Sequence, residues 1–242
     1  MAGSMERWYQ AAQRRYSVRA YSAGPEEGQL EALRQMAEAL SARGVRIFVG
    51  EDDDIFSGLL GSKIKGTKAF AAFISQGAAP SAVGYIGEAF ILECAAMGLD
   101  TCWLGMNFSR AAAMSAAGVQ KGEKLEIVTP IGISAGSYIE RPRHSLEELC
   151  ELTKKEIEML PEWKRCALEC ARRAPSAINA QPWSFDAYGR GIEVERISSN
   201  FGYGKLDCGI AMLHIELGAG HCGVAGDWKE NGDRAVFLPN NV

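Results

Sequence analysis

The 242-residue sequence contains no run of about 20 apolar residues and no apolar signal core near its amino terminus. A membrane span needs the first and a secretory signal needs the second, so we expect a cytoplasmic protein with no membrane partner. The 26 basic and 30 acidic side chains leave a net charge of -4, which gives no general field for attracting nucleic acid. Membrane and nucleic-acid partners are therefore not expected.

Metal-binding patterns are also scarce. The seven cysteines form no Cys-x-x-Cys pair, and their number is odd, which indicates reduced thiols. Cys166 and Cys170 share a helix face, but no histidine or carboxylate at ligand spacing joins them. The acidic run 51–54 lacks the glycine and the spaced ligands of a calcium loop and fits a solvated turn better. We expect no metal site.

The hydrophobic pattern alternates between helical and extended periods along the chain. Apolar stripes, prolines at helix starts and glycines at helix ends mark the helices, and one helix has a capping box made by Ser145 and Glu148. Ser4 is a candidate cap for the first helix. The expected helices lie near 5–12, 25–43, 83–97, 145–159, 162–173 and 206–220, and the expected strands near 45–49, 69–74, 125–133, 183–188, 191–197 and 234–238.

One stretch concentrates polar groups on a short restrained loop, Pro175-Ser-Ala-Ile-Asn-Ala-Gln-Pro-Trp183. Pro175 ends the preceding helix, and Pro182 turns the chain toward the next strand. Between the prolines, one hydroxyl and two amides are kept out of helix and ladder hydrogen bonds. This arrangement is suited to ligand binding, with an ordinary helix-to-strand turn as the alternative.

A second stretch near the amino terminus places Arg15, Ser17 and Arg19 at alternate positions. In an extended segment these side chains leave on one face, where two guanidinium groups and a hydroxyl can surround a phosphate. A solvated basic run at a helix end explains the same residues equally well.

Three further segments carry candidate ligand contacts. Arg141 and Arg143 flank a proline and face one way if extended, which makes a second anion clamp or a surface turn. Lys65-Gly66 precedes an apolar strand, where the glycine either admits a ligand closely or only forms a turn. The segment 101–105 continues into Met106 and ends in exposed backbone amides that can meet a ligand.

Taken together, these motifs resemble the signatures of the nitroreductase family of flavin enzymes. The resemblance rests on Arg15-x-Ser17-x-Arg19 and on the run from Pro175 to Trp183, with support from Lys65-Gly66, from 87–103 and from Arg141-Pro-Arg143. It covers most of the chain and implies an α+β fold with mainly antiparallel sheets flanked by helices.

The order of the motifs departs from the usual family pattern. Ordinary members place the Pro-Ser loop a few dozen residues after the Arg-Ser-Arg stretch, whereas about 160 residues intervene here. Usual members are homodimers with FMN at the interface, so the chain resembles a single-chain mimic of that dimer, similar to the thermophile-type nitroreductase subfamily. We expect halves at 1–160 and 161–242, internally duplicated, with one flavin site per chain. This arrangement allows a monomer and leaves further self-association open. Gly98 and Cys102 match Gly218 and Cys222 at a constant offset of 120, each pair closing a helix.

The resemblance also implies roles for individual residues. Arg15, Ser17 and Arg19 would hold the FMN phosphate and ribityl end, with backbone contacts from Tyr16 and with Arg143 and Arg141 completing the clamp. The loop residues Pro175, Ser176, Ala177 and Asn179 would cover the ring, with Lys65 nearby. The amide of Gly105 or Met106 would sit near the reactive N5. The chemistry then belongs to the flavin, and no side chain has to act as nucleophile or general base.

The implied function is an FMN-dependent oxidoreductase that takes a hydride from NAD(P)H and reduces a small-molecule electron acceptor such as a nitroaromatic or a quinone. The alternative is a scaffold or sensor protein that has lost flavin or turnover. His144, His214 and His221 have no evident relay partner, and the latter two share one helix, where a structural role is favoured.

Overall fold

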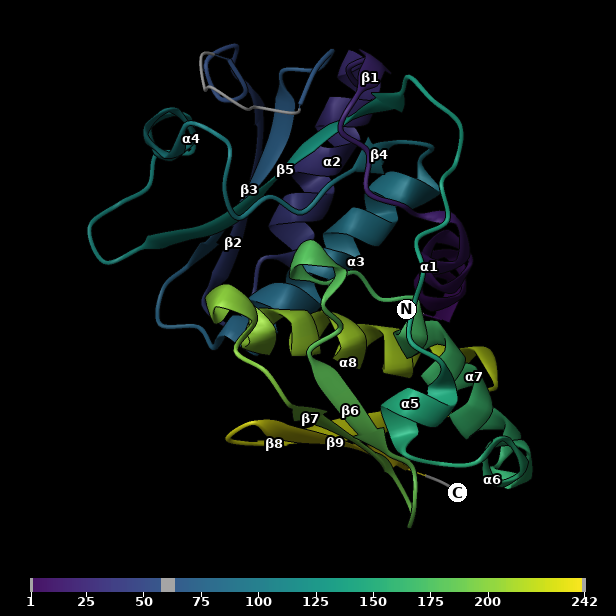
Figure 1. Cartoon of the computed structure of the whole chain (residues 1–242). Coiled ribbons are helices and arrows are strands. Elements are labelled where there is room, and N and C mark those ends of the chain that lie inside the picture. The colour runs from purple at the N-terminus through teal and green to yellow at the C-terminus, as the bar shows by residue number, and fades with distance from the viewer. Residues whose placement is uncertain (1, 58–63, 241–242) are drawn as a thin grey trace. The chain divides into compact units, whose positions relative to one another are not determined.

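The computed structural model describes residues 2–57 and 64–240, and the chain forms two compact units (Figure 1). The five-strand unit comprises residues 14–141, and the four-strand unit comprises residues 1–13 and 142–242. This division differs from the expected boundary at residue 160. Residues 142–160 and residues 1–13 both belong to the four-strand unit. The expected internal duplication stays a prediction.

The five-strand unit is built on an antiparallel sheet with the order β1-β5-β3-β2, in which β4 also pairs with β5. Its central strand β3 is buried along all seven residues, as the continuous apolar run predicts. The strands are β1 (Tyr21–Ala23), β2 (Val45–Glu51), β3 (Ala69–Ser75), β4 (Asp100–Thr101) and β5 (Lys124–Ser134), and the helices are α2 (Glu27–Leu40), α3 (Pro80–Ala96) and α4 (Arg110–Ala116).

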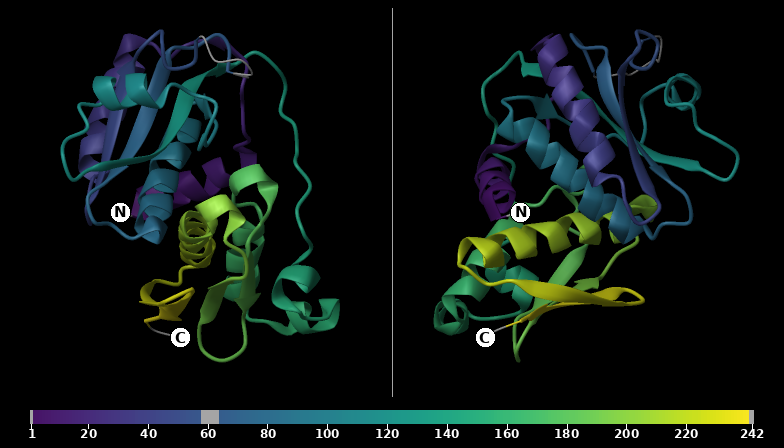
Figure 2. Two further views of the ribbon diagram at one scale, coloured as in Figure 1. Left: turned by 60° about the vertical axis from the view of Figure 1, so that its left-hand side comes forward. Right: turned by 180° about the vertical axis from the view of Figure 1, so that it is seen from behind.

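Helices cover both faces of this sheet, with α2 and α3 on one face and α4 on the other (Figure 2). On the α3 face, Phe73 packs against Phe90 and lies 4.8 Å from the ring of Trp103. Gly87 of α3 makes room for that indole, since a Cβ there would lie 2.5 Å from Trp103 Cη2. Trp103 Nε1 donates to the buried Glu88 at 2.8 Å. The segment 101–105 is therefore fixed by side-chain packing as well as by β4.

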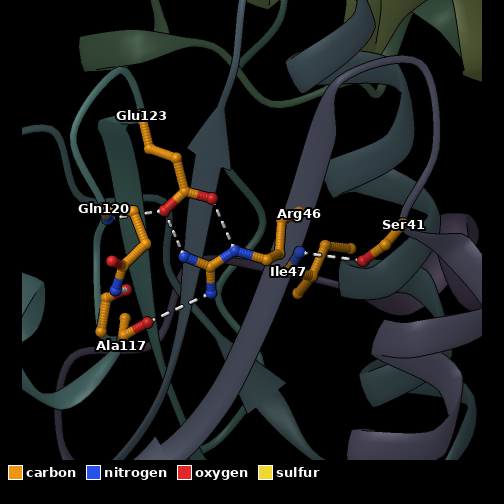
Figure 3. A network of polar contacts seen from close by, with 7 residues as sticks. Ser41, Arg46, Ile47, Ala117, Gln120 and Glu123 are labelled. Atoms are coloured by element: carbon orange, nitrogen blue, oxygen red, sulfur yellow. Dashed lines mark hydrogen bonds and ion pairs between the residues drawn. The ribbon is translucent and has the colours of Figure 1, made fainter.

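An ion pair ties β2 to the turn before β5 (Figure 3). Arg46 donates from Nε to Glu123 Oε1 at 2.9 Å and from Nη2 to Oε2 at 2.7 Å, and its Nη1 reaches the carbonyl of Ala117 at 3.1 Å. The Gln120 amide also donates to Glu123, at 2.8 Å. Arg46 and, to a smaller extent, this amide lower the pKa of Glu123 to about 2. The pair fixes the edge strand to the loop that follows α4.

The four-strand unit has an antiparallel sheet with the order β6-β7-β9-β8, and α7 and α8 pack side by side over it (Figure 2). Its buried aromatic side chains include Trp163, Trp183, Phe185 and Phe237. The strands are β6 (Trp183–Asp186), β7 (Ile192–Arg196), β8 (Gly226–Asn231) and β9 (Arg234–Pro239); the helices are α1 (Ala2–Arg14), α5 (Leu146–Cys150), α6 (Lys154–Met159), α7 (Glu162–Arg172) and α8 (Gly204–His221), with the 3-10 turns η1 (Ala177–Asn179) and η2 (Asn200–Gly202).

Three local expectations were wrong. Ser4 lies inside α1, which begins at Ala2. The Ser145 capping box is present, but the helix after it breaks at Glu151, whose left-handed φ of 52° separates α5 from α6, and Thr153 caps the second piece. Gly218 does not close its helix; it lies inside α8, where its missing side chain lets α7 approach.

The cysteines and histidines fit structural roles. All seven cysteines are free thiols, and five of them are buried. His214 is fully buried, and its Nδ1 lies 3.0 Å from the carbonyl oxygen of Cys170. Among residues 2–57 and 64–240, no helix has both the length and the apolar character needed to cross a bilayer.

Candidate functional site

The residues of the two expected half-sites fall into different units, and each half-site has its own geometry. In the five-strand unit, the segment after α1 runs extended between two neighbours. Val18 donates to the carbonyl of Thr101 at 2.9 Å, and on the other side Lys65 donates to the carbonyl of Arg19 at 3.0 Å. Val18 and Tyr21 are buried and anchor the segment. The backbone is thus fixed around the predicted clamp.

The clamp side chains gather beside Cys102. Arg15 Nη2 lies 3.4 Å from Ser17 Oγ, while its buried Nε has no hydrogen-bond partner among the described residues. Burial raises the pKa of the Cys102 thiol, whereas Arg19, Arg15, the Ser17 hydroxyl and Arg141 act in the opposite direction. The charges of three guanidinium groups and one hydroxyl thus act on the same thiol, and guanidinium and hydroxyl groups are the donors that a phosphate requires.

Tyr16 turns its side chain away from this cluster. Its hydroxyl lies 2.9 Å from Ser134 Oγ and donates to the carbonyl of Gly136 at 3.3 Å, and its ring meets Tyr138 edge-on. These contacts tie the clamp segment to the chain that follows β5. A backbone role for Tyr16 is compatible with this arrangement.

Lys65 and Gly66 serve the clamp through their backbone. Tyr21 donates to the carbonyl of Lys65 at 2.8 Å, and a Cβ on Gly66 would lie 1.9 Å from the carbonyl oxygen of Tyr21. Gly66, with φ of +83°, is thus required by the approach of Tyr21. The Lys65 side chain is exposed and borders an open cleft of about 580 Å³, whose lining also includes Glu51, Asp53 and Lys68.

Gly105 and Met106 follow directly on a fixed point of the chain. Leu104 and Val128 exchange two backbone hydrogen bonds, at 2.8 and 3.1 Å, so the turn after Leu104 starts from the sheet. Met106 is 64 % exposed. The structure places the two residues at a turn where Gly105 is half-buried and Met106 is exposed, and their role toward a ligand stays a prediction.

In the four-strand unit, the Pro175–Trp183 loop adopts a left-handed conformation at three non-glycine residues. Ile178, Asn179 and Gln181 have φ of 50°, 61° and 47°. Such angles cost on the order of 1 kcal/mol each and persist where surrounding contacts enforce them. Here the Gln181 amide donates to Ser176 Oγ at 2.8 Å, closing the loop on itself.

Polar side chains of this loop hold the segment that carries Arg143. Asn179 Nδ2 donates to the carbonyl of Pro142 at 2.9 Å, and Gln181 Oε1 accepts from the His144 amide at 2.9 Å. Arg143 Nη2 in turn donates to the carbonyl of Arg173, at 3.3 Å. The structure therefore brings Arg143 together with the loop. Arg141 belongs to the five-strand unit, where its charge acts on Cys102 together with those of Arg15 and Arg19.

Two anchoring residues escaped the sequence analysis. Asp207, near the start of α8, accepts from the Ala177 amide at 3.1 Å, and Asn200 bonds both Asp207 and the Ala177 carbonyl. The available signal was a carboxylate in the first turn of a helix rich in apolar and small residues. That signal is ambiguous, because acidic residues also favour helix N-termini for electrostatic reasons.

The family model described as "Putative TM nitroreductase" matches residues 7–219, which is most of the chain. The chain belongs to this nitroreductase family. Membership makes it an oxidoreductase of the nitroreductase kind, and it confirms the resemblance inferred from the clamp and loop motifs. No curated protein matches the chain.

Solved structures support the same fold for this nitroreductase. A protein described as "a putative nitroreductase" from Thermotoga maritima MSB8 has a TM-score of 0.69 at 18 % identity, over 96 % of this chain and 93 % of that one. The "hypothetical oxidoreductase YcnD" from Bacillus subtilis has a TM-score of 0.50 at 14 % identity, over 62 % of this chain and 76 % of that one. The α+β nitroreductase fold expected from the sequence is confirmed, and the likeness does not extend to a substrate.

Proposed function

We propose that the protein is an FMN-dependent NAD(P)H oxidoreductase that reduces nitroaromatic, quinone or similar small acceptors. The observations that carry the proposal are the approach of Arg15 to Ser17 and the positive charges of Arg19, Arg15 and Arg141, all of which act on the buried thiol of Cys102. A buried guanidinium nitrogen without a partner, such as Arg15 Nε, is costly unless a ligand completes its bonding. A dianionic phosphate would supply that acceptor.

In this proposal the arginines and Ser17 bind the phosphate and ribityl end, with Arg143 completing the clamp. The other half-site covers the ring with Pro175, Ser176, Ala177 and Asn179. The Ser176 hydroxyl accepts from the backbone amide of Gln181 and keeps its own hydrogen for donation. The Asn179 side chain donates from Nδ2 to the Pro142 carbonyl and keeps its Oδ1 as an acceptor. Both groups thus retain bonding capacity for a ligand.

Lys65 and the turn at Gly105 and Met106 complete the proposed set. The exposed Lys65 ammonium adds positive charge on the five-strand unit. A backbone amide of Gly105 or Met106 would donate to N5, and a fixed donor at that position favours the reduced, negatively charged form. Bound FMN would supply the hydride chemistry, while the chain binds and orients it.

The reductant, the acceptor and the assembly are parts of the same proposal. NAD(P)H would bind transiently, and the acceptor would follow it at the same flavin face. Because one chain contains both half-sites, we propose that a single chain is sufficient for one flavin site, which light scattering of the active species can check.

The experiment is the visible spectrum of the purified protein after incubation with FMN and removal of free flavin. We expect one equivalent of bound FMN, with absorbance near 450 nm that bleaches when NADH or NADPH is added anaerobically and returns with a quinone. Protein that cannot bind FMN would contradict the proposal and favour the scaffold alternative. Protein that binds FMN but stays yellow with both nicotinamides would favour a flavin sensor.

A further inference from the structure

A closed ring of hydrogen bonds surrounds Ala177, the first residue of η1. The Ala177 amide donates to Asp207 Oδ1 at 3.1 Å, and Asp207 Oδ2 accepts from Asn200 Nδ2 at 2.6 Å. The same Nδ2 donates its second hydrogen to the Ala177 carbonyl at 3.0 Å. Both backbone groups of Ala177 are thus held by a carboxylate–amide pair from α8 and η2.

The pair is costly to maintain. Asp207 is 2 % exposed and Asn200 6 % exposed, and a buried carboxylate loses the hydration that stabilises its charge. Burial raises the pKa of Asp207 to about 6, against the opposing effects of Asn200 and the Ala177 amide. Asn200 also adopts a left-handed φ of 44°. A buried carboxylate held by specific partners favours a functional role over a purely structural one.

The order of donors and acceptors in the ring is fixed by Ala177. Its N–H needs an acceptor and its C=O needs a donor, so the carboxylate and the amide cannot exchange places. Both oxygens of Asp207 accept, and the bonds from Asn200 and from the Ala177 amide favour the ionised form of this buried carboxyl, against the larger effect of burial. While Asp207 stays buried under the loop, protonation therefore weakens the bonds of the ring and loosens its hold on Ala177.

We propose that Asp207 and Asn200 are positioning residues that keep the Pro175–Asn179 loop in its flavin-binding conformation only while Asp207 is ionised. This inference rests on the proposed function of the loop. Binding of flavin then becomes sensitive to pH through a group that touches neither flavin nor substrate.

Other charged groups near this end of α8 have partners of their own. Asp233 pairs with Arg196 of β7 at 2.7 Å and with Lys205 at 3.4 Å. Burial, followed by the charge of Asp207, raises the pKa of the Cys208 thiol to about 12, so that this thiol is neutral throughout the relevant range. The titrating member of the group near pH 6 is Asp207.

The first test uses the protein without flavin. Amide hydrogen exchange reports the protection of the Ala177 N–H, corrected for intrinsic rates and compared with amides of β7 and β9. In the wild type, we expect protection at Ala177 to fall about tenfold between pH 7 and pH 5, since a hydrogen bond to a charged group is lost. Unchanged protection would overturn the proposal, and this measurement requires no variant.

The second test compares Asp207→Asn with the control Asp233→Asn, which removes an exposed carboxylate from the same unit. The phosphate of FMN itself titrates near pH 6 and affects all three proteins alike. We therefore compare, at each pH, the FMN dissociation constant of each variant divided by that of the wild type, since this ratio isolates the contribution of the protein. For Asp207→Asn we expect a ratio of about 10 at pH 8 that approaches 1 at pH 5. For Asp233→Asn the ratio should stay within twofold of 1 throughout.

The outcomes separate this inference from the proposed function. Wild-type protein that binds no FMN at any pH, yet loses protection at Ala177 below pH 6, contradicts the flavin proposal and leaves the ring intact as a pH-dependent device. Wild-type protein that binds FMN, with an Asp207→Asn variant whose affinity and pH profile match it, overturns the positioning role.

Discussion

Gly218 of α8 lies so close to α7 that a Cβ at this position would be 2.5 Å from the carbonyl oxygen of Cys166. The two helices form the largest helix–helix contact of the four-strand unit. For Gly220, two residues later in the same helix, the described part of the chain places only Met5 Cε within 4 Å of an added Cβ, at 3.7 Å. The pair offers a matched comparison of two helical glycines.

We expect Gly218→Ala to destabilise the protein by about 2 kcal/mol or more, because the added methyl group must push two backbones apart. Gly220→Ala should be neutral or stabilise by about 0.5–1 kcal/mol, as alanine favours a helix. Urea unfolding of both variants measures the difference. Equal free energies of unfolding would show that α7 and α8 are not in such close contact.

Gly66 and Gly77 provide a second matched pair in the five-strand unit. Both have positive φ, of +83° and +69°, but a Cβ on Gly66 would meet the Tyr21 carbonyl at 1.9 Å, whereas Gly77 has open space. Gly77→Ala should cost about 1 kcal/mol of backbone strain. Gly66→Ala should cost about 3 kcal/mol or more and also weaken FMN binding, since the 64–66 segment supports Arg19. Thermal unfolding checks the first expectation and flavin titration the second; similar losses for both variants would contradict the packing at Gly66.

The Arg46–Glu123 pair predicts a pH dependence of stability. The pKa of Glu123 is lowered from 4.5 to about 2 in the folded protein, so its contribution is present above pH 4.5 and is lost as the pH falls toward 2. After screening by solvent, we expect Glu123→Gln to lose about 1 kcal/mol at pH 7 and close to nothing near pH 2. Urea midpoints at both pH values measure this, with the exposed Glu38→Gln as control. A deficit that does not shrink in acid would argue against the ion pair.

The phosphate clamp predicts a selective loss of flavin. Arg15→Ala combined with Arg19→Ala should raise the FMN dissociation constant at least about a hundredfold, because two charge-assisted contacts disappear. Arg34→Ala combined with Lys121→Ala removes the same charge from the surface of the same unit and should change it less than threefold. Fluorescence titration gives both constants; equal effects would assign the loss to net charge and not to the clamp.

The sequence predicted the parts of the fold that depend on periodicity. The apolar run 69–74 predicted the buried strand β3, and the helical apolar pattern within 25–43 predicted α2, which buries Leu30, Leu33 and Ala37. It missed β8, whose residues are mostly exposed and polar, because such a strand depends on pairing with β9 and not on its own pattern.

Contacts between residues far apart in sequence could not be predicted in the same way. Gly218 was interpreted as a helix terminator because spacing indicates neither depth nor partner. The loop polar groups were expected to face a ligand, yet Asn179 and Gln181 also bond Pro142 and His144, 37 residues away. The Asp207–Asn200 ring was missed for the same reason, since each residue alone has an ordinary local explanation.

The central claim, that one flavin takes contacts from the Arg15 cluster and from the Pro175–Asn179 loop, is tested most directly by titrating FMN and riboflavin into three proteins. The wild type should bind FMN more tightly than riboflavin. Arg15→Ala combined with Arg19→Ala should abolish that preference, whereas Ser176→Ala combined with Asn179→Ala should weaken both ligands by a similar factor of about ten or more. If either double variant binds both flavins as the wild type does, its half-site does not contact the flavin and the account is wrong.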